Sequence, residues 1–381
     1  MKTKTLLYDV YHPWELAFHS AEGATLTDEN GKTYLDCYGG HGVISIGHNH
    51  PIWKKALTQQ LNTISYYSNA VKIRQQEEVA EVLERVSGLT DYRLFLCNSG
   101  AEANENAMKI ASFETGRSKV LAFEKAFHGR TAGAIAVTDN PNIVAPFGKS
   151  LNQTKIALND GEALVRELST NEYAAVIIEG IQGVAGVFEG NTAFWKKLRE
   201  LCDSTGTKLI ADEIQSGCGR TGDFFAFQYH QVRADIITMA KGIGNGFPVA
   251  AVLIDSKLEP KKGQLGTTFG GSYLACAAVK SVLETIEQEN LLENSKTIGT
   301  WLKENLSAIN GVEEVRGRGL MLGIKTKVKA TELQQLLINE GVVAGNSTCP
   351  FTLRILPPLN ITQEQAEQFI QVFSHLPIGV Q

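Results

Sequence analysis

The sequence has little cysteine, no long apolar run and no large excess of charge of either sign. Its 381 residues include six cysteines, none of them in a Cys-x-x-Cys spacing, so reduced thiols are a better interpretation than metal or redox pairs. No apolar stretch reaches the roughly 18 residues that a membrane-spanning helix needs. The formal net charge of −5, without a basic run, gives no electrostatic footprint for nucleic acid.

The start of the chain contains lysines but no apolar segment of signal-peptide length in residues 1–9. We therefore expect a cytoplasmic protein. The hydrophobic content of 43% and the charged content of 20% are ordinary for a soluble globular enzyme, and the length allows two domains.

The middle of the chain alternates short apolar runs with helical stretches. Because these runs are continuously apolar, we expect strands covered on both faces, and hence a mostly parallel sheet in an α/β fold. The alanine-rich spacing of residues 102–113 (Ala103, Ala107, Ile110 and Ala111) predicts a helix with a small-residue buried stripe. The predicted strands are residues 92–97, 119–123, 174–178, 208–211, 236–239 and 249–254.

Both ends of the chain predict a smaller α+β domain. After Ser272 the pattern gives helices and short strands, and residues before about 50 carry strand and turn signals. The C-terminal helices are predicted at residues 274–288, 291–305, near 331–340 and from 362 onward, with strands near 312–315 and 321–324. We expect residues 1–50 and 261–381 to form the small domain and residues 51–260 to form the large one.

Lys241 is the first candidate for chemistry. It follows the predicted strand 236–239, and three of the next five residues are glycines, which let other groups come close. Asp212 ends the preceding strand, about thirty residues upstream. A single lysine is usually a solvated surface group, but a lysine and a carboxylate at the ends of two successive strands suit an enzyme of pyridoxal phosphate.

Residues 97–104 (CNSGAEAN) indicate a strand, a turn and the start of a helix. Backbone N–H groups at residues 99–101 would point to one place beside the positive end of the helix, which is an anion site. The alternative is an ordinary N-cap by Asn98 or Ser99. A phosphate cofactor near Lys241 favours the anion site.

Further candidates lie in loops. In residues 126–131 (AFHGRT), Phe127 could stack on a cofactor ring or belong to the core, and Arg130 could bind a carboxylate. Residues 266–272 offer two hydroxyls on a glycine-flanked loop, or a simple turn. Arg354 stands among apolar residues, where it could bind substrate or form a structural salt bridge. The glycines of residues 242–246 (GIGNG) lack the full dinucleotide-binding pattern.

Together these motifs resemble the class III (subgroup II) pyridoxal-phosphate-dependent aminotransferases of fold type I, and among them the acylornithine aminotransferases most. The resemblance covers nearly the whole chain. Its motifs are residues 31–36 (GKTYLD), 47–51 (GHNHP), 98–105 (NSGAEANE), 127–131 (FHGRT), 212–215 (DEIQ), 240–244 (AKGIG) and 268–271 (TFGG).

The resemblance implies a role for each matching residue in cofactor binding. Lys241 would be the Schiff-base lysine and the proton shuttle, and Asp212 would pair with the pyridine nitrogen. The remaining cofactor contacts would be Gln215 to the ring oxygen, Phe127 on the ring face, Gly100 and Ala101 at the phosphate, and Thr268 at the phosphate of the partner subunit.

The resemblance also implies the substrates. Arg130, with Thr267 nearby, would hold the α-carboxylate of the acylornithine, and Arg354 that of 2-oxoglutarate or glutamate. The implied reaction transfers the terminal amino group of N2-acetyl- or N2-succinyl-ornithine to 2-oxoglutarate, in arginine biosynthesis, in a homodimer with shared active sites. The alternatives are ornithine or 4-aminobutyrate aminotransferase, a pyridoxal phosphate aminomutase, and a binding protein without the cofactor. No metal site is expected.

Two residues depart from the family pattern. His41 stands where relatives have isoleucine or tyrosine, so we expect it either to contact the acyl end of the donor or to pack against the neighbouring glycine turn. Val184 stands where relatives have a glutamate that pairs with the arginine matching Arg354. We therefore expect Arg354 to stay without such a partner, or to find another, such as Glu189 or a carboxylate on the donor itself.

Overall fold

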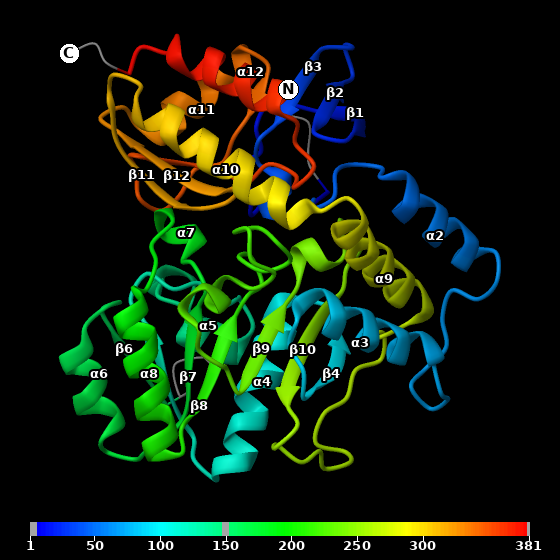
Figure 1. The fold of residues 1–381 in the computed structure, drawn as a ribbon, viewed down its shortest axis with the longest axis vertical. Helices are drawn as coiled ribbons and strands as arrows, with labels where there is room; N and C mark the ends of the chain where they lie inside the picture. The colour runs from blue at the N-terminus through cyan, green and yellow to red at the C-terminus, as the bar shows by residue number, and fades with distance from the viewer. Residues whose placement is uncertain (1–5, 147–151, 379–381) are drawn as a thin grey trace.

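The computed structural model describes residues 6–146 and 152–378. Its centre is a seven-stranded sheet in the order β4-β10-β9-β8-β7-β5-β6, in the lower half of Figure 1. The strands are β4 (Tyr92–Cys97), β5 (Lys119–Phe123), β6 (Gln153–Ile156), β7 (Tyr173–Glu179), β8 (Lys208–Asp212), β9 (Ile236–Met239) and β10 (Ala250–Asp255).

The predicted mostly parallel sheet is confirmed, with one exception in direction. Strand β10 pairs antiparallel with both β4 and β9, whereas the pairs among β6, β5, β7, β8 and β9 are parallel. The six predicted strands are present within one or two residues of their expected limits. Strand β6 was not predicted because it is short, partly polar and lies at the sheet edge.

Helices cover both faces of this sheet, and alternate residues of each strand point to opposite faces. On β5, Val120 and Ala122 pack with the alanines of α4 (Gly100–Thr115), while Leu121 and Phe123 belong to the core on the other face. That second core takes in α3 (Arg74–Ser87), α6 (Gly161–Leu168), α8 (Thr192–Thr205) and α9 (Tyr273–Gln288). The predicted stripe of α4 is largely correct, although Ile110 is only partly buried.

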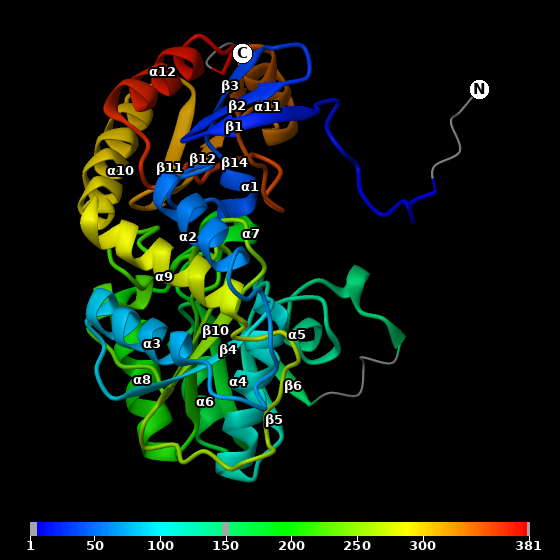
Figure 2. The same cartoon turned by 90° about the vertical axis from the view of Figure 1, so that its right-hand side faces the viewer.

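The second region, at the top of Figure 2, joins residues from both ends of the chain. Strand β3 pairs in parallel with β13, so Leu35 lies opposite Val342. One sheet holds β1 (Phe18–Glu22), β2 (Thr25–Asp28), β3 (Thr33–Asp36) and β13 (Val342–Val343), and another holds β11 (Val312–Arg318), β12 (Met321–Thr326) and β14 (Thr352–Ile355). The helices here are α10 (Leu291–Ser307), α11 (Ala330–Asn339) and α12 (Gln363–Ser374), close to the predicted positions.

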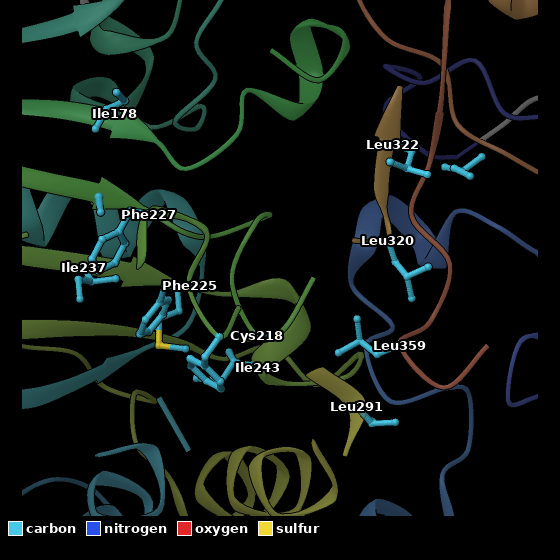
Figure 3. Close-up of a cluster of buried hydrophobic side chains, with 14 of the residues drawn as sticks. Ile178, Cys218, Phe225, Phe227, Ile237, Ile243, Leu291, Leu320, Leu322 and Leu359 are labelled. Atoms are coloured by element: carbon cyan, nitrogen blue, oxygen red, sulfur yellow. The ribbon is translucent and has the colours of Figure 1, made fainter. Parts of the chain in front are cut away.

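The two regions share one continuous hydrophobic core. Figure 3 shows Ile178 and Ile237 of the central sheet in the same cluster as Leu322 of β12 and Leu320, which precedes that strand. Helix α9 also packs on α2 (Pro51–Leu61) and α3. This packing fixes the smaller region beside the carboxyl ends of the central strands. The domain boundaries expected at residues 50 and 260 stay a prediction. No helix in the described part of the chain is long and apolar enough to cross a membrane.

Candidate active site

The carboxyl ends of β4, β5, β7, β8 and β9 meet at one cavity of about 430 Å³. Crevices at this edge of a parallel sheet are the usual ligand sites of α/β folds. The walls include most of the predicted site residues: Gly100, Ala101, Phe127, Arg130, Asp212, Gln215 and Lys241, together with Asn98, His128, Glu179 and Val184.

Lys241 begins the short helical turn η4 (Lys241–Ile243), directly after β9. Its backbone φ is 49°, in the left-handed region that residues other than glycine rarely adopt. Backbone strain of this kind is concentrated at functional sites. Burial lowers the pKa of the Lys241 amine, and the charge of Arg354 acts in the same direction, against the opposing charges of Asp212 and Glu179. The amine is therefore more easily available as a neutral nucleophile or base.

Asp212 lies at the end of β8 and is 3% exposed. Its Oδ2 accepts a hydrogen bond from Asn104 Nδ2 at 2.7 Å and lies 2.7 Å from His128 Nδ1, and its Oδ1 accepts from the Ile214 N–H at 3.0 Å. Asn104 is held in turn by Thr238, whose hydroxyl donates to Asn104 Oδ1 at 2.7 Å. These contacts fix the carboxylate in one orientation on the cavity wall.

His128 and Asn104 lie within the sequence motifs 127–131 and 98–105, but the sequence predicted no role for either. His128 is 2% exposed and Asn104 is completely buried. The signal that could have found His128 is its place in the loop 126–131, between two residues already chosen as candidates. Only the fold could show that Asn104, more than a hundred residues before Asp212, meets the same carboxylate oxygen.

Helix α4 directs its first turn at the cavity. Ser99 is its N-cap, and the Ser99 hydroxyl accepts from the Glu102 N–H at 3.2 Å. The N–H groups of Gly100 and Ala101 lie at the positive end of the helix, where the first-turn donors have no acceptor within the helix and could receive an anion. The N-cap by Ser99 is therefore confirmed, while the anion site at Gly100 and Ala101 stays a prediction that this N-cap does not oppose.

The loop after β5 is packed tightly against this helix start. A Cβ atom added to Gly129 would come within 2.7 Å of the Ala101 Cβ, so this position has no room for a side chain. Phe127 is anchored by its N–H, which donates to Glu179 Oε1 at 2.9 Å.

Burial, aided by the charge of Asp212, raises the pKa of Glu179 to about 7, while the charge of His128 opposes this shift. Arg130 is exposed on the cavity wall.

Gln215 forms hydrogen bonds with two other predicted site residues. Its Nε2 donates to the backbone carbonyl of His41 at 3.0 Å, and its Oε1 accepts from Arg354 Nη1 at 3.2 Å. Arg354 and His41 are therefore held next to the cavity by Gln215, one of its lining residues, although neither lines it directly. Glu189, named above as a possible partner of Arg354, instead forms an ion pair with Arg318 at 2.6 Å, so that suggestion was wrong.

His41 belongs to an unusual turn, α1 (Gly39–Gly42). All four residues have positive φ, between 54° and 74°, and His41 is the one that carries a side chain. Its ring packs on Tyr38, with centroids 4.8 Å apart. Partial burial lowers the pKa of His41, and the charges of Arg354 and Lys241 lower it further, so the ring is neutral at physiological pH.

The loop 266–272 lies behind the cavity wall on one side and reaches the surface on the other. Thr267 Oγ1 accepts from Asn98 Nδ2 at 2.9 Å, which places this hydroxyl against a lining residue. Thr268 is exposed and does not line the cavity of its own chain, and its carbonyl accepts from the Tyr66 hydroxyl at 3.0 Å. Both threonine assignments stay predictions.

The residues present fit pyridoxal phosphate. The fit rests on three features of one cavity: an amine with a lowered pKa, a buried carboxylate fixed by neighbouring groups, and a helix start with free N–H groups. A phosphate, a pyridine nitrogen and an aldehyde are the groups that these features would receive. Six cysteines are free, and no cluster of three or more metal-ligating side chains occurs among the described residues.

Comparison with known proteins gives consistent matches along the whole chain. A family model described as class-III aminotransferase matches residues 8–376. An acetylornithine aminotransferase of Methanosarcina mazei is 39% identical over 375 residues, covering 97% of this chain and 94% of that protein. One of Bacillus subtilis is 37% identical over 370 residues, covering 96% and 95%.

Solved structures also match over nearly the whole chain, at lower sequence identity. The ornithine aminotransferase of Toxoplasma gondii, described with pyridoxal phosphate at its active site, has a TM-score of 0.91 at 28% identity and covers 97% of this chain and 91% of its own. The acetylornithine aminotransferase of Elizabethkingia anophelis has a TM-score of 0.84 at 30% identity, covering 96% and 94%.

Proposed function

This chain belongs to the class-III aminotransferases, and we propose that it transfers the terminal amino group of N2-acetyl-L-ornithine, or of its N2-succinyl analogue, to 2-oxoglutarate. The products are the N-acyl glutamate semialdehyde and glutamate, and the reaction serves arginine biosynthesis in the cytoplasm. The observation that carries the proposal is the cavity in which Lys241, Asp212 and the start of α4 converge. The donor is supported by the relatives of 36–39% identity, which are named acetylornithine aminotransferases.

Bound pyridoxal phosphate supplies an aldehyde that reacts with amines and a protonated ring that withdraws electrons from the substrate carbon. We propose that Lys241 Nζ holds the cofactor through its aldehyde, and that Asp212 faces the ring nitrogen. Phe127 would pack on the ring, Gln215 would hydrogen-bond the ring oxygen, and the N–H groups of Gly100 and Ala101 would hold the phosphate.

The residues of the chain then carry out proton transfer and positioning. With the cofactor bound, the Lys241 amine would remove a proton from the substrate carbon and pass it to the cofactor. Asp212 keeps the ring nitrogen protonated because its charge is fixed by Asn104 and His128. Arg130 and Thr267 orient the α-carboxylate of the donor, and Arg354 that of the keto acid. Both half-reactions use the same site in turn.

We also propose a homodimer whose two active sites are shared. The support is an exposed apolar surface next to Thr268, in which the rings of Tyr66 and Phe269 lie 5.5 Å apart. Apolar surfaces of this kind mark protein contacts. Thr268, exposed on its own chain, would then reach the phosphate in the second copy. The exposed large apolar side chains of residues 61–71 and of the loop 266–272 are Leu61, Ile64, Tyr66, Tyr67, Val71 and Phe269.

A second candidate is transfer from free ornithine, favoured by the likeness to the Toxoplasma gondii structure. A panel of amino donors assayed with 2-oxoglutarate, with glutamate as the measured product, separates the candidates. We expect the two N-acylated ornithines to give the highest kcat/KM, with ornithine and 4-aminobutyrate at least tenfold lower, a difference of about 1.4 kcal/mol in transition-state stabilisation. A higher value for free ornithine would replace the proposal by the second candidate, and no glutamate from any donor would refute both.

A further inference from the structure

Phe127 lines the active-site cavity without belonging to the hydrophobic core. The residue is half-buried. Within residues 6–146 and 152–378, it belongs to none of the three hydrophobic clusters, and its ring has no aromatic or cation partner. The position of Phe127 therefore depends on what holds its backbone, rather than on core packing of its ring.

The backbone of Phe127 is held by Glu179, at the end of β7. The Phe127 N–H donates to Glu179 Oε1 at 2.9 Å, across 52 residues of sequence. Glu179 is 8% exposed and lines the same cavity. In the parallel pair of β7 and β8, Glu179 is the register partner of Asp212. The carboxyl that holds Phe127 therefore stands beside the carboxyl assigned to the ring nitrogen of the cofactor.

The next residue, His128, is tied to the sheet by other contacts. Its Nδ1 lies 2.7 Å from Asp212 Oδ2, and its backbone N–H and carbonyl each have a side-chain partner. Two consecutive loop residues are thus fixed by two adjacent strand ends, Phe127 by Glu179 and His128 by Asp212. Because His128 already anchors the loop, the bond to Glu179 adds control over Phe127 alone.

The Glu179 carboxyl can keep this bond in either protonation state. Burial and the charge of Asp212 raise the pKa of Glu179 to about 7, against the charge of His128 and the bond from Phe127. A carboxylate oxygen and the carbonyl oxygen of a protonated carboxyl both accept a hydrogen bond. The feature that matters for Phe127 is therefore the acceptor atom and not the charge, so an amide should replace the carboxyl.

We propose that Glu179 is a positioning residue, whose Oε1 holds the Phe127 backbone so that the Phe127 ring packs on the cofactor ring beside Asp212. This inference rests on the proposed function, because it concerns how the cofactor of that reaction is kept in place. It assigns Glu179 no contact with substrate and no proton transfer. Without the acceptor, the Phe127 ring samples more orientations and covers the cofactor less well.

The test measures how fast pyridoxal phosphate leaves the loaded full chain after dilution, together with the visible circular dichroism of the bound cofactor. Glu179→Gln keeps the acceptor and removes the charge, whereas Glu179→Leu removes both. We expect the release rate to rise roughly tenfold in Glu179→Leu and less than about threefold in Glu179→Gln. The dichroic band should weaken in Glu179→Leu alone, because it reports a ring fixed in an asymmetric site. Release from Glu179→Leu that is no faster than from Glu179→Gln would overturn the proposal.

A double-mutant cycle shows whether the effect acts through the Phe127 ring. Phe127→Leu removes the ring but keeps the N–H that bonds to Glu179. We expect Phe127→Leu to speed release, and the double variant with Glu179→Leu to release the cofactor no faster than Phe127→Leu does. Effects of the two substitutions that multiply would show that Glu179 acts independently of this ring, against the proposal.

Glu213 provides the matched control. It is a fully buried carboxyl whose pKa is also raised to about 7 by burial, and it accepts from the N–H groups of Ala226 and Phe227 at 3.0 Å each, outside the cavity. Glu213→Leu should lower thermal stability without speeding cofactor release. Equal acceleration by Glu213→Leu and Glu179→Leu would reveal a general loss of stability and contradict the positioning role.

Two further measures keep the outcome clear. If Glu179→Leu fails to fold, Glu179→Met replaces it, since a thioether sulfur accepts only weakly. The donor panel described above is run separately. Transfer from acylornithine with equal cofactor release by the two Glu179 variants would refute the positioning role alone. The expected release pattern without transfer from any donor would refute the proposed function alone.

Discussion

His128 Nδ1 lies 2.7 Å from Asp212 Oδ2, and both side chains are almost completely buried. The same carboxylate oxygen accepts from Asn104, so two groups from different parts of the chain hold it in place. A carboxylate fixed in this way keeps its direction and charge without having to reorganise during the reaction. We interpret His128 and Asn104 as positioning residues for Asp212.

Asp212→Asn should retain the fold and the cofactor but lower kcat roughly a hundredfold or more, because an amide cannot keep the ring nitrogen protonated. Steady-state kinetics with N-acetylornithine and 2-oxoglutarate measure this. The matched control is Asp255→Asn, which removes another buried carboxylate of the same sheet, bonded to Arg233 at 2.9 Å and outside the cavity. If both variants kept wild-type kcat, Asp212 would have no place in the mechanism.

Lys241→Ala should abolish transamination while leaving the protein folded, because the covalent attachment and the proton transfer depend on one amine. Each role is typically worth on the order of a hundredfold or more. Circular dichroism controls for folding, and single-turnover assays measure the residual rate. Turnover near the wild-type rate, without an added amine, would show that another group does this work.

Glu179→Gln should change how stability depends on pH. Because the folded-state pKa of Glu179 is about 7, above its ordinary value of 4.5, the folded protein holds this proton more tightly than the unfolded chain. Its contribution to stability is therefore fully present below about pH 4.5 and is lost as pH rises through 7. Denaturant unfolding of cofactor-free wild type and Glu179→Gln at pH 5.5, 7 and 8.5 is the measurement. A constant difference between the two proteins would contradict the assignment.

His41→Ile should change the choice between acyl groups. The partly buried ring packs on Tyr38 and is affected by the charge of Arg354, and it belongs to a left-handed turn that is costly for a residue with a side chain, which points to a role for this histidine. Its neutral imidazole can donate a hydrogen bond to a carboxylate on the donor. We expect the ratio of kcat/KM for N-succinylornithine to that for N-acetylornithine to fall severalfold in the variant. A fall of this size corresponds to the loss of about one hydrogen bond. An unaltered ratio would show that His41 only packs on Tyr38 and does not contact the acyl group of the donor.

Much of this site could be predicted from local sequence. Lys241 and Asp212 follow apolar strands, and residues 97–104 show a strand running into a helix, so parallel-sheet geometry alone brings them to one edge. The direction of β10 could not be predicted, because a continuously apolar strand has the same pattern whichever way it runs. The cavity therefore followed from the sequence, while one strand of its scaffold did not.

The contacts among distant residues could not be predicted in the same way. Gln215 bonds to Arg354, 139 residues away in sequence, and to the carbonyl of His41, 174 residues away. The pairing of Glu189 with Arg318 likewise depends on how the smaller region is seated on the central sheet. Such contacts are fixed by tertiary packing, which leaves no periodic signal in the sequence.

The most direct test of the proposed reaction follows the nitrogen atom itself. N2-acetyl-L-ornithine labelled with ¹⁵N at its terminal amine is incubated with the enzyme and unlabelled 2-oxoglutarate, and glutamate is analysed by mass spectrometry. The proposed reaction predicts that the label appears in glutamate in proportion to turnover, and that Lys241→Ala gives none. Unlabelled glutamate, or none from wild type, would contradict the assignment of this chain as an acylornithine aminotransferase.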